Sequence, residues 1–328
     1  MCLQEVMFMV SVSAVHRTAV LLTAMLIMAG AWGFFHIPGA NMLIIVFTFL
    51  SSAFLFDVPV FHERLNIALL LAAYASTAQF LISVFFRLPA LQTVSSALFA
   101  FFAFCTLPDI RCGCLVMITG YLSFFAPSGF VPGFSRSIDI FVAVAVIMAV
   151  TTISSINDRK TAASFTPCSC VQSLVLAAEL GIGNILFKLL QLKQGAWIML
   201  TVLFITMSES PRSPGEKLAV ERIFAVPLGI MAGGALLAVF SRMDHRFVYL
   251  VPLIAATGFF FLYNYGNFFV FSLFFIIALT VFTDWMTGTY QSFRFLDTFI
   301  SRTVSSWLGA VLFLIVRWGE NPRKERSL

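Results

Sequence analysis

Long runs of apolar residues, separated by short polar segments, fill almost the whole chain. A helix needs about 20 apolar residues to cross the hydrocarbon layer of a membrane, so we take runs of that order, bounded by charges, Pro or Gly, as membrane spans. The fifth and eighth runs are short. The spans are predicted at residues 18–33, 42–57, 65–86, 90–107, 113–125, 137–156, 170–191, 195–207, 221–240, 247–263, 267–282 and 294–318. The pattern predicts an all-α integral membrane protein with about twelve transmembrane helices.

The composition of the chain agrees with this fold class. Of its 328 residues, 60% are apolar and 11% are charged, whereas a water-soluble domain carries about a quarter charged residues. So few charges cannot cover a soluble surface, which excludes a disordered chain, a soluble enzyme with a membrane anchor and a nucleic-acid-binding domain. We therefore expect membrane lipid around the chain and no nucleic acid partner.

The basic residues set the expected orientation. With twelve spans, the side that holds both termini collects twelve Lys and Arg residues and the opposite side collects seven, with Arg302 left out because it lies inside the last span. Cytoplasmic loops carry the excess of basic residues. Both termini are therefore predicted to lie in the cytoplasm, and the net charge of +5 records topology more than partners.

The cysteines and histidines indicate no metal site. All six cysteines fall at or near the predicted cytoplasmic face, where thiols stay reduced, so no disulfide is expected; they are Cys2, Cys105, Cys112, Cys114, Cys168 and Cys170. Their two Cys-x-Cys pairs lack the Cys-x2-Cys spacing of usual zinc sites. The four histidines suggest no cluster, and we find no phosphate-binding or hydrolase motif. We expect no metal, no cofactor and no enzymatic activity.

Charged signatures recur at a constant spacing and predict a duplication. Two pairs of them stand 158 positions apart, namely Glu63-Arg64 with Glu221-Arg222, and Arg136 and Asp139 with Arg294 and Asp297. We infer two six-helix repeats, residues 1–160 and 161–328. Because each has an even number of spans, the repeats run parallel, as in some secondary transporters, which place the substrate path between the halves. The alternative is that the duplication only doubled a packing unit.

Glu179 and Arg302 lie away from the ends of predicted spans, where a charge is expensive and marks a functional candidate. Glu179 is near the middle of the seventh span, and the next charged residue is Lys188. Burial favours the neutral form of a carboxylic acid, which is the property that a proton carrier needs. The alternative is a structural Glu paired with a cation, because polar pairs also hold membrane helices together. Arg302 is the natural partner to test.

A polar row in the last span extends the candidate site. It consists of Arg294, Asp297, Ser301 and Ser305, whose spacings of 3, 4 and 4 place them on one helical face. Such a row should face protein or water. Asp297 can pair with Arg294 one turn earlier, which leaves Arg302 for an anion or for Glu179.

Other polar residues complete the set of substrate-binding or coupling candidates. They are Arg222 and Arg64 at the predicted cytoplasmic mouth, Asp139 in the first half and Asn184 in the seventh span. The helix that carries Asp139 turns apolar after it, so the second half is expected to carry more of the chemistry. In the ninth span, Gly229 and Gly233 should let a neighbouring backbone approach.

The eighth and ninth spans carry a family resemblance. The run Gly195-Ala196-Trp197-Ile198-Met199-Leu200-Thr201-Val202 is followed by a Pro/Ser/Gly loop at 208–215 and by Arg222, which opens a Gly-rich helix. This order resembles the fusaric-acid-resistance and aromatic-acid-exporter membrane proteins, in which a Trp and a Thr precede a loop and an Arg. Ala225-Val226 stands where that family usually has Gly-Thr.

The resemblance implies a function. It indicates a minimal member of the family without a soluble domain, which exports small organic or aromatic acids across a bacterial inner membrane with a periplasmic adaptor protein. Our hypothesis is a proton-driven exporter in which Arg302, with Arg222 or Arg64, attracts the anion and Glu179 exchanges the proton. The alternatives are a passive anion channel, a non-catalytic assembly subunit and, less favoured, a lipid-modifying enzyme. The sequence leaves open the substrate, the coupling ion and whether the chain forms a homo-oligomer.

Overall fold

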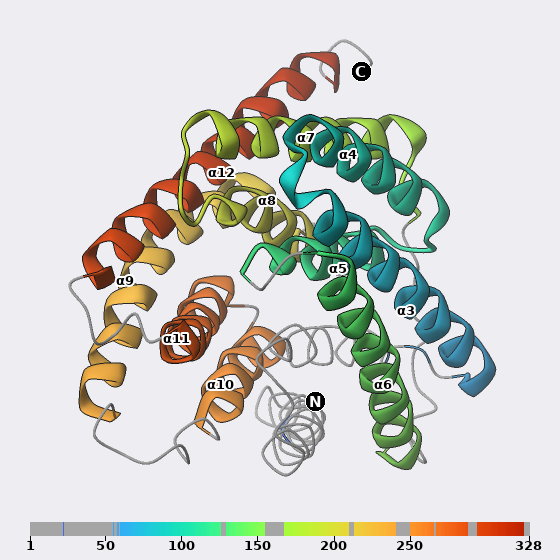
Figure 1. Ribbon diagram of the computed structural model, residues 1–328, viewed down its shortest axis with the longest axis horizontal. Helices are drawn as coiled ribbons and strands as arrows, with labels where there is room; N and C mark the ends of the chain where they lie inside the picture. The colour runs from blue at the N-terminus through green and yellow to red at the C-terminus, as the bar shows by residue number, and fades with distance from the viewer. Residues whose placement is uncertain are drawn as a thin grey trace, which may run out of the picture. The chain divides into compact units, whose positions relative to one another are not determined.

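The computed structural model describes Leu22, Leu55, Val58 and residues 60–125, 129–154, 167–209, 213–240, 250–265, 267–287 and 294–324. The elements in this part are helices: α3(Phe61–Val84), η2(Phe85–Arg87), α4(Pro89–Thr106), α5(Ile110–Tyr121), η3(Leu122–Phe125), α6(Phe130–Ser154), α7(Cys170–Leu189), α8(Ala196–Ser208), α9(Gly215–Phe240), α10(Leu250–Tyr265), α11(Phe268–Thr287) and α12(Arg294–Lys324) (Figure 1). The predicted all-α fold class is confirmed. Spans 18–33 and 42–57 lie outside the described residues, apart from Leu22 and Leu55, so the number of twelve spans stays a prediction.

The helices fall into two groups by length: some can cross a membrane, and others are too short. Six helical segments of the described part are long and apolar enough to cross a membrane: Phe61–Arg87, Pro89–Thr106, Val131–Val150, Cys170–Leu189, Gly215–Val239 and Leu296–Trp318. By contrast, α5 has 12 residues and α8 has 13, which corresponds to about 18 and 20 Å. Residues 112–121 and 196–206 of these two helices are all buried. The two short apolar runs are therefore core helices enclosed by protein, and they pack against each other.

Several helices extend beyond the predicted spans, most clearly α6, α9 and α12. α6 begins at Phe130 instead of residue 137, because Pro132 sits in the first turn, where its missing N–H costs no hydrogen bond. α9 begins at Gly215 instead of residue 221 and carries Glu216 in its first turn, where an acidic side chain complements the helix dipole. α12 continues to Lys324. Charged residues end an apolar run without ending the helix.

The chain divides into two compact units. Unit one comprises Met1–Leu69, Phe141–Ala163 and Ala225–Asp297, and unit two comprises Leu70–Ile140, Ser164–Phe224 and Thr298–Leu328. Each unit draws segments from both predicted repeats, and α3, α6, α9 and α12 each contain residues of both units. The unit boundaries at Leu70 and Ala225 are 155 positions apart, and those at Phe141 and Thr298 are 157 apart. These offsets are close to the predicted repeat, although the repeats themselves stay a prediction.

In unit one, α10 packs against α11, and the C-terminal part of α9 also lies close to α11. A Cβ atom added at Gly229 would stand 2.8 Å from the Cβ of Ile276, and one at Gly233 would stand 2.8 Å from the Cβ of Thr280. Real Cβ atoms do not approach other atoms so closely. The two glycines therefore allow the close helix contact that the sequence predicted.

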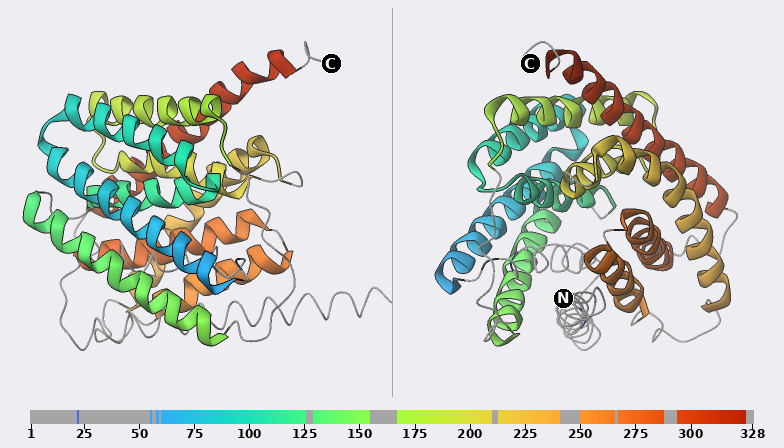
Figure 2. Two further views of the ribbon diagram at one scale, coloured as in Figure 1. Left: turned by 90° about the vertical axis from the view of Figure 1, so that its right-hand side faces the viewer. Right: turned by 180° about the vertical axis from the view of Figure 1, so that it is seen from behind.

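In unit two, α4 lies beside α7, and α8 packs against α5 and α7. Figure 2 shows α4 and α7 running side by side. The C-terminal part of α12 approaches α8 at Gly309, where an added Cβ would stand 2.9 Å from the Cβ of Thr201. α8 is thus surrounded by α5, α7 and α12, and most of the candidate residues lie in this unit.

Candidate functional site

Two buried arginines lie over one face of α8. Trp197, Thr201 and Phe204 are spaced by four and three residues, so their side chains share that face. The guanidinium carbon of Arg302, from α12, lies 5.9 Å from the centroid of the Trp197 ring. The guanidinium carbon of Arg222, from α9, lies 4.8 Å from the centroid of the Phe204 ring. We call these five residues the arginine face.

The helices that carry the arginine face are held together by specific contacts. Gly309 lets α12 approach α8 at Thr201. Next to it, the indole Nε1 of Trp307 on α12 donates a hydrogen bond of 2.9 Å to the carbonyl oxygen of Ile223 on α9. At the other end, the backbone N–H of Gln194, just before α8, donates to the Ser301 hydroxyl at 3.1 Å. These contacts fix where Arg222 and Arg302 stand above α8.

Arg222 has few protein partners for a charged group that is 0% exposed. Its Nε donates a long hydrogen bond of 3.5 Å to the Thr201 hydroxyl. In the described part of the chain, neither Nη1 nor Nη2 has a hydrogen-bond acceptor. Buried charges are costly unless they are paired and hydrogen-bonded. The arrangement therefore leaves both terminal nitrogens of Arg222 able to donate to an anion.

Arg136 on α6 shows the opposite arrangement. It is 2% exposed, and its Nε donates to the Pro132 carbonyl at 3.0 Å while Nη2 donates to the Ser83 hydroxyl at 3.2 Å. With the Gln79 amide oriented to satisfy both of its groups, its oxygen accepts from Arg136 Nη1 at 3.1 Å and its nitrogen donates to the Thr119 carbonyl at 3.2 Å. All three nitrogens of Arg136 are used inside the protein, so this arginine is structural.

Arg64 occupies the position that the predicted repeat pairs with Arg222. It lies in unit one, is 2% exposed, and donates from both Nε and Nη2 to the carbonyl oxygen of Val58, at 2.9 and 2.7 Å. Unlike Arg222, Arg64 thus has two guanidinium nitrogens bound to a nearby carbonyl oxygen of the backbone. The two candidates are therefore chemically different, and Arg222 is the better anion donor.

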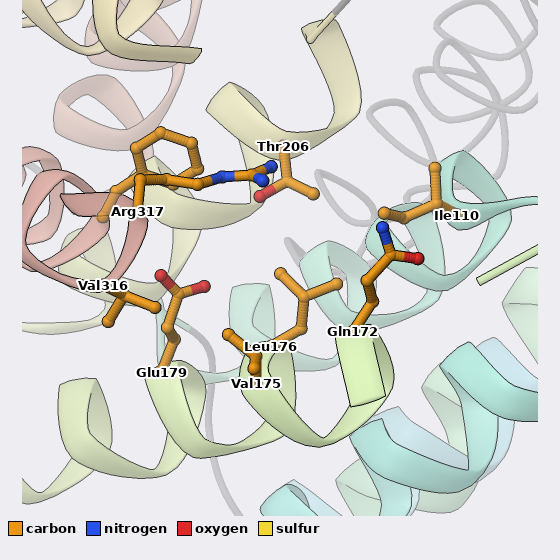
Figure 3. Close-up of a pocket in the computed structure, with 9 residues that line it drawn as sticks. Ile110, Gln172, Val175, Leu176, Glu179, Thr206, Val316 and Arg317 are labelled. Carbon is orange, nitrogen blue, oxygen red and sulfur yellow. The ribbon is translucent and has the colours of Figure 1, made fainter. Parts of the chain in front are cut away.

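Glu179 is buried, at 3% exposure, and borders a small cavity of about 30 Å³. The cavity is also lined by Thr206 from α8, Gln172 from α7 and Arg317 from α12 (Figure 3). Arg317 pairs with Glu209 and lies 5.4 Å from the centroid of the Phe313 ring. A volume of this size suits about one water molecule. The predicted burial of Glu179 and of Arg302, which is 2% exposed, is confirmed.

The remaining candidates lie in different surroundings. Asn184 on α7 is 0% exposed, and its Nδ2 donates a long hydrogen bond of 3.4 Å to the Ser96 hydroxyl on α4. Asp139 on α6 is half-buried, and Asp297 is exposed in unit one. Of the polar row on α12, Ser305 is buried and Ser301 is half-buried. The row is thus enclosed toward Ser305 and exposed at Asp297.

Sequence reasoning missed Arg317 and Thr206 because both looked like the ends of helices. Gln79 completes the hydrogen bonding of Arg136, a role that depends on the packing of α3 against α6. The motif that resembles the family contains Trp197, Thr201 and Arg222, which all belong to the arginine face. Among the described residues, no three His, Cys, Asp or Glu side chains are placed to hold a metal ion, and the described cysteines are free thiols.

Comparison with known proteins gives one match. No curated protein and no solved structure matches the chain. Residues 180–316 match the family model described as fusaric acid resistance protein-like. The matched segment contains the whole arginine face and begins one residue after Glu179. This agrees with the resemblance predicted from the motif around α8 and α9: over residues 180–316 the chain is similar to the fusaric acid resistance protein-like family.

Proposed function

We propose that this protein exports small organic or aromatic acids across a bacterial inner membrane. The observation that carries the proposal is Arg222, a fully buried guanidinium whose two terminal nitrogens have no acceptor in the described part of the chain. A carboxylate binds a guanidinium through two parallel hydrogen bonds. An organic acid would therefore supply the acceptors that Arg222 lacks.

The surroundings of Arg222 favour an aromatic acid. Phe204 and Trp197 offer ring surfaces on the same face of α8, and aromatic pairs stack or pack edge to face. Arg302 places a second cation on this face, above Trp197. The pair of cations with the pair of rings matches a ligand that has one anionic end and one planar apolar end.

Glu179 is the proposed proton carrier. A buried carboxylic acid in a membrane favours the neutral form, and the cavity beside it has room for about one water. Arg317 and Thr206 on the same cavity supply a cation and a hydroxyl. Arg317, which pairs with Glu209, thus borders the same cavity as the proposed proton carrier.

The similarity of residues 180–316 to the fusaric acid resistance protein-like family supports this function over catalysis. The proposal also includes a periplasmic adaptor protein as partner and cytoplasmic termini, as the family resemblance implies. Arg64, Asp139, Asp297 and Asn184 remain secondary candidates for binding or coupling. The substrate path between two six-helix repeats is part of the same proposal and rests on the duplication predicted from the charged signatures 158 positions apart.

The test is transport by the purified protein in liposomes. Vesicles loaded with a radiolabelled aromatic carboxylate are diluted with and without an imposed proton gradient, and efflux is measured. An exporter should show gradient-stimulated efflux that Arg222→Lys reduces at least tenfold, because Lys cannot form two parallel hydrogen bonds. Arg87→Lys, at an exposed position, should transport normally.

Other outcomes would replace the proposal. Efflux that continues unchanged after the proton gradient is collapsed would identify a passive anion channel. No efflux by reconstituted protein, combined with stable co-purification of a partner, would identify a non-catalytic assembly subunit. Normal transport by Arg222→Lys would remove the arginine face from the mechanism.

A further inference from the structure

A second and larger cavity lies in unit two, where the end of α7 meets the start of α4. Its volume is about 460 Å³. Phe86, Pro89 and Gln92 form one wall, and Phe187, Lys188 and residues 191–193 form the other. It shares no lining residue with the arginine face or with the Glu179 cavity. We call it the α4–α7 cavity.

Gln92 is the feature that marks this cavity as a binding site. Its side chain is 1% exposed, and neither its Nε2 nor its Oε1 has a hydrogen-bond partner in the part of the chain that the structure describes. Buried polar side chains are hydrogen-bonded in nearly all proteins. An amide without partners on the wall of a cavity therefore indicates that a bound group supplies the missing hydrogen bonds.

The charge around the cavity favours an anion. α4 begins here with Pro89, and Leu88, which precedes it, offers no capping side chain, so the positive end of the helix dipole points toward this end of the cavity. Lys188 holds its ammonium at this helix end, because Nζ donates to the Pro89 carbonyl at 2.6 Å and to the Thr93 hydroxyl at 3.3 Å. Lys193 adds a second cation, and the lining residues that the structure describes include no carboxylate.

The flanks of the cavity are apolar. Leu88, Leu189 and Leu190 are 55%, 73% and 50% exposed, as expected of side chains that face lipid. The Phe124 ring packs between the rings of Phe86 and Phe187, with centroid distances of 5.6 and 5.2 Å. Lys188 lies in the last turn of α7, and Lys193 lies just beyond the end of that helix. The cavity thus lies at a boundary between an apolar surface and cationic groups.

One more residue of the lining has unusual geometry. Gln191 adopts a φ of +48°, a left-handed conformation that glycine usually takes at the end of a helix. Its backbone N–H donates to the Lys188 carbonyl at 3.3 Å, which turns the chain back over the cavity. This turn brings Gln191 and Lys193 to the same cavity as Lys188.

We propose that the α4–α7 cavity binds the phosphate headgroup of an anionic membrane phospholipid. The Gln92 side chain donates a hydrogen bond to the headgroup, Lys188 and Lys193 balance its charge, and the acyl chains lie along the exposed leucines. The apolar flank favours a lipid over a soluble phosphate, since a soluble ion has no group to cover it. The pair of cations favours an anionic lipid over a zwitterionic one.

Binding to the full-length protein in detergent tests the proposal. Phosphatidylglycerol, phosphatidylcholine and soluble glycerol 3-phosphate are titrated separately, and the bound ligand is counted by native mass spectrometry. We expect phosphatidylglycerol to bind about tenfold more tightly than phosphatidylcholine, a ratio that corresponds to about 1.4 kcal/mol. Gln92→Leu and Lys193→Gln should each weaken phosphatidylglycerol binding by about tenfold, since each loses a bond to a charged group. Lys217→Gln, at an exposed lysine on α9, should bind phosphatidylglycerol like the wild type.

A stability measurement separates binding from folding. Without lipid, Gln92→Leu should unfold at the same temperature as the wild type or higher, because it removes two buried polar atoms that lack partners. If that variant fails to fold, the exposed Lys193 position carries the test alone. Equal affinity for the two phospholipids, wild-type binding by both variants, or glycerol 3-phosphate binding as tightly as phosphatidylglycerol would each overturn the proposal.

Discussion

Replacing Arg222 by Met should stabilise the protein while removing transport. Met has an unbranched side chain of similar reach and needs no hydrogen bond. The substitution loses the long hydrogen bond to Thr201 and the cation–π contact with Phe204, worth together about 2–3 kcal/mol. It also removes two buried nitrogens without acceptors in the described part of the chain, each of which costs about 1–3 kcal/mol.

The lost contacts lower the stability of the variant, whereas removal of the two buried nitrogens without acceptors raises it. Taking the middle of each range, Arg222→Met should raise the free energy of unfolding by about 1–2 kcal/mol. Arg136→Met is the matched control, because Arg136 is equally buried but uses all three of its nitrogens inside the protein. Three hydrogen bonds from a charged group are worth about 4 kcal/mol or more together, so this variant should be strongly destabilised.

The assay is reversible unfolding of both variants in mixed micelles with an increasing fraction of SDS, followed by tryptophan fluorescence, with efflux measured on the same preparations. The reasoning would be refuted if Arg222→Met lost as much stability as Arg136→Met. That result would mean that Arg222 is held by the protein in the way that Arg136 is, and that its terminal nitrogens are not kept for a ligand.

Three further predictions follow from the same contacts. Glu179→Gln should keep binding of the aromatic acid but lose the stimulation of efflux by a proton gradient, because the amide cannot exchange a proton; gradient-stimulated efflux in this variant would remove Glu179 from the coupling step. Gly309→Val should lower the unfolding free energy by about 1–3 kcal/mol and reduce transport, because its Cβ would stand 2.9 Å from the Cβ of Thr201; unchanged unfolding and transport would show that α12 does not approach α8 so closely. Trp197→Leu should raise the substrate concentration for half-maximal efflux more for aromatic acids than for aliphatic acids of the same charge, and an equal change for both would argue against ring contact.

Helix positions were predictable because each apolar run has to match the thickness of a membrane. The runs around α4, α7 and α10 were located to within a few residues. The starts of α6 and α9 were placed too late, because the helices begin in the less apolar segments before residues 137 and 221, with Pro132 near the start of α6 and Glu216 in the first turn of α9. The sequence also could not show that α5 and α8 are enclosed by protein, because a helix that faces lipid and a helix that faces other helices are both apolar.

The candidate site was predictable only in part. Arg302 and Glu179 stood out because a charge inside an apolar run is rare, and Arg222 stood out through its distance from Trp197 and Thr201 in the motif. Arg317 could not be found in this way, because it follows the apolar run and resembles an ordinary flanking charge. Its place beside the Glu179 cavity depends on how α7, α8 and α12 pack. Gln92 was missed for a related reason: its lack of partners is a property of three-dimensional surroundings.

The most direct test of the central claim is the distance between a bound carboxylate and the side chain of Arg222. Solid-state NMR of the protein in lipid bilayers, with ¹⁵N-labelled arginine and ¹³C-carboxyl-labelled benzoate, measures this distance through the dipolar coupling. We predict a coupling that corresponds to about 4 Å between the carboxyl carbon and a guanidinium nitrogen, present in the wild type and in Arg64→Lys and absent in Arg222→Lys. A bound benzoate without such a coupling, or one whose coupling survives in Arg222→Lys, would contradict the account.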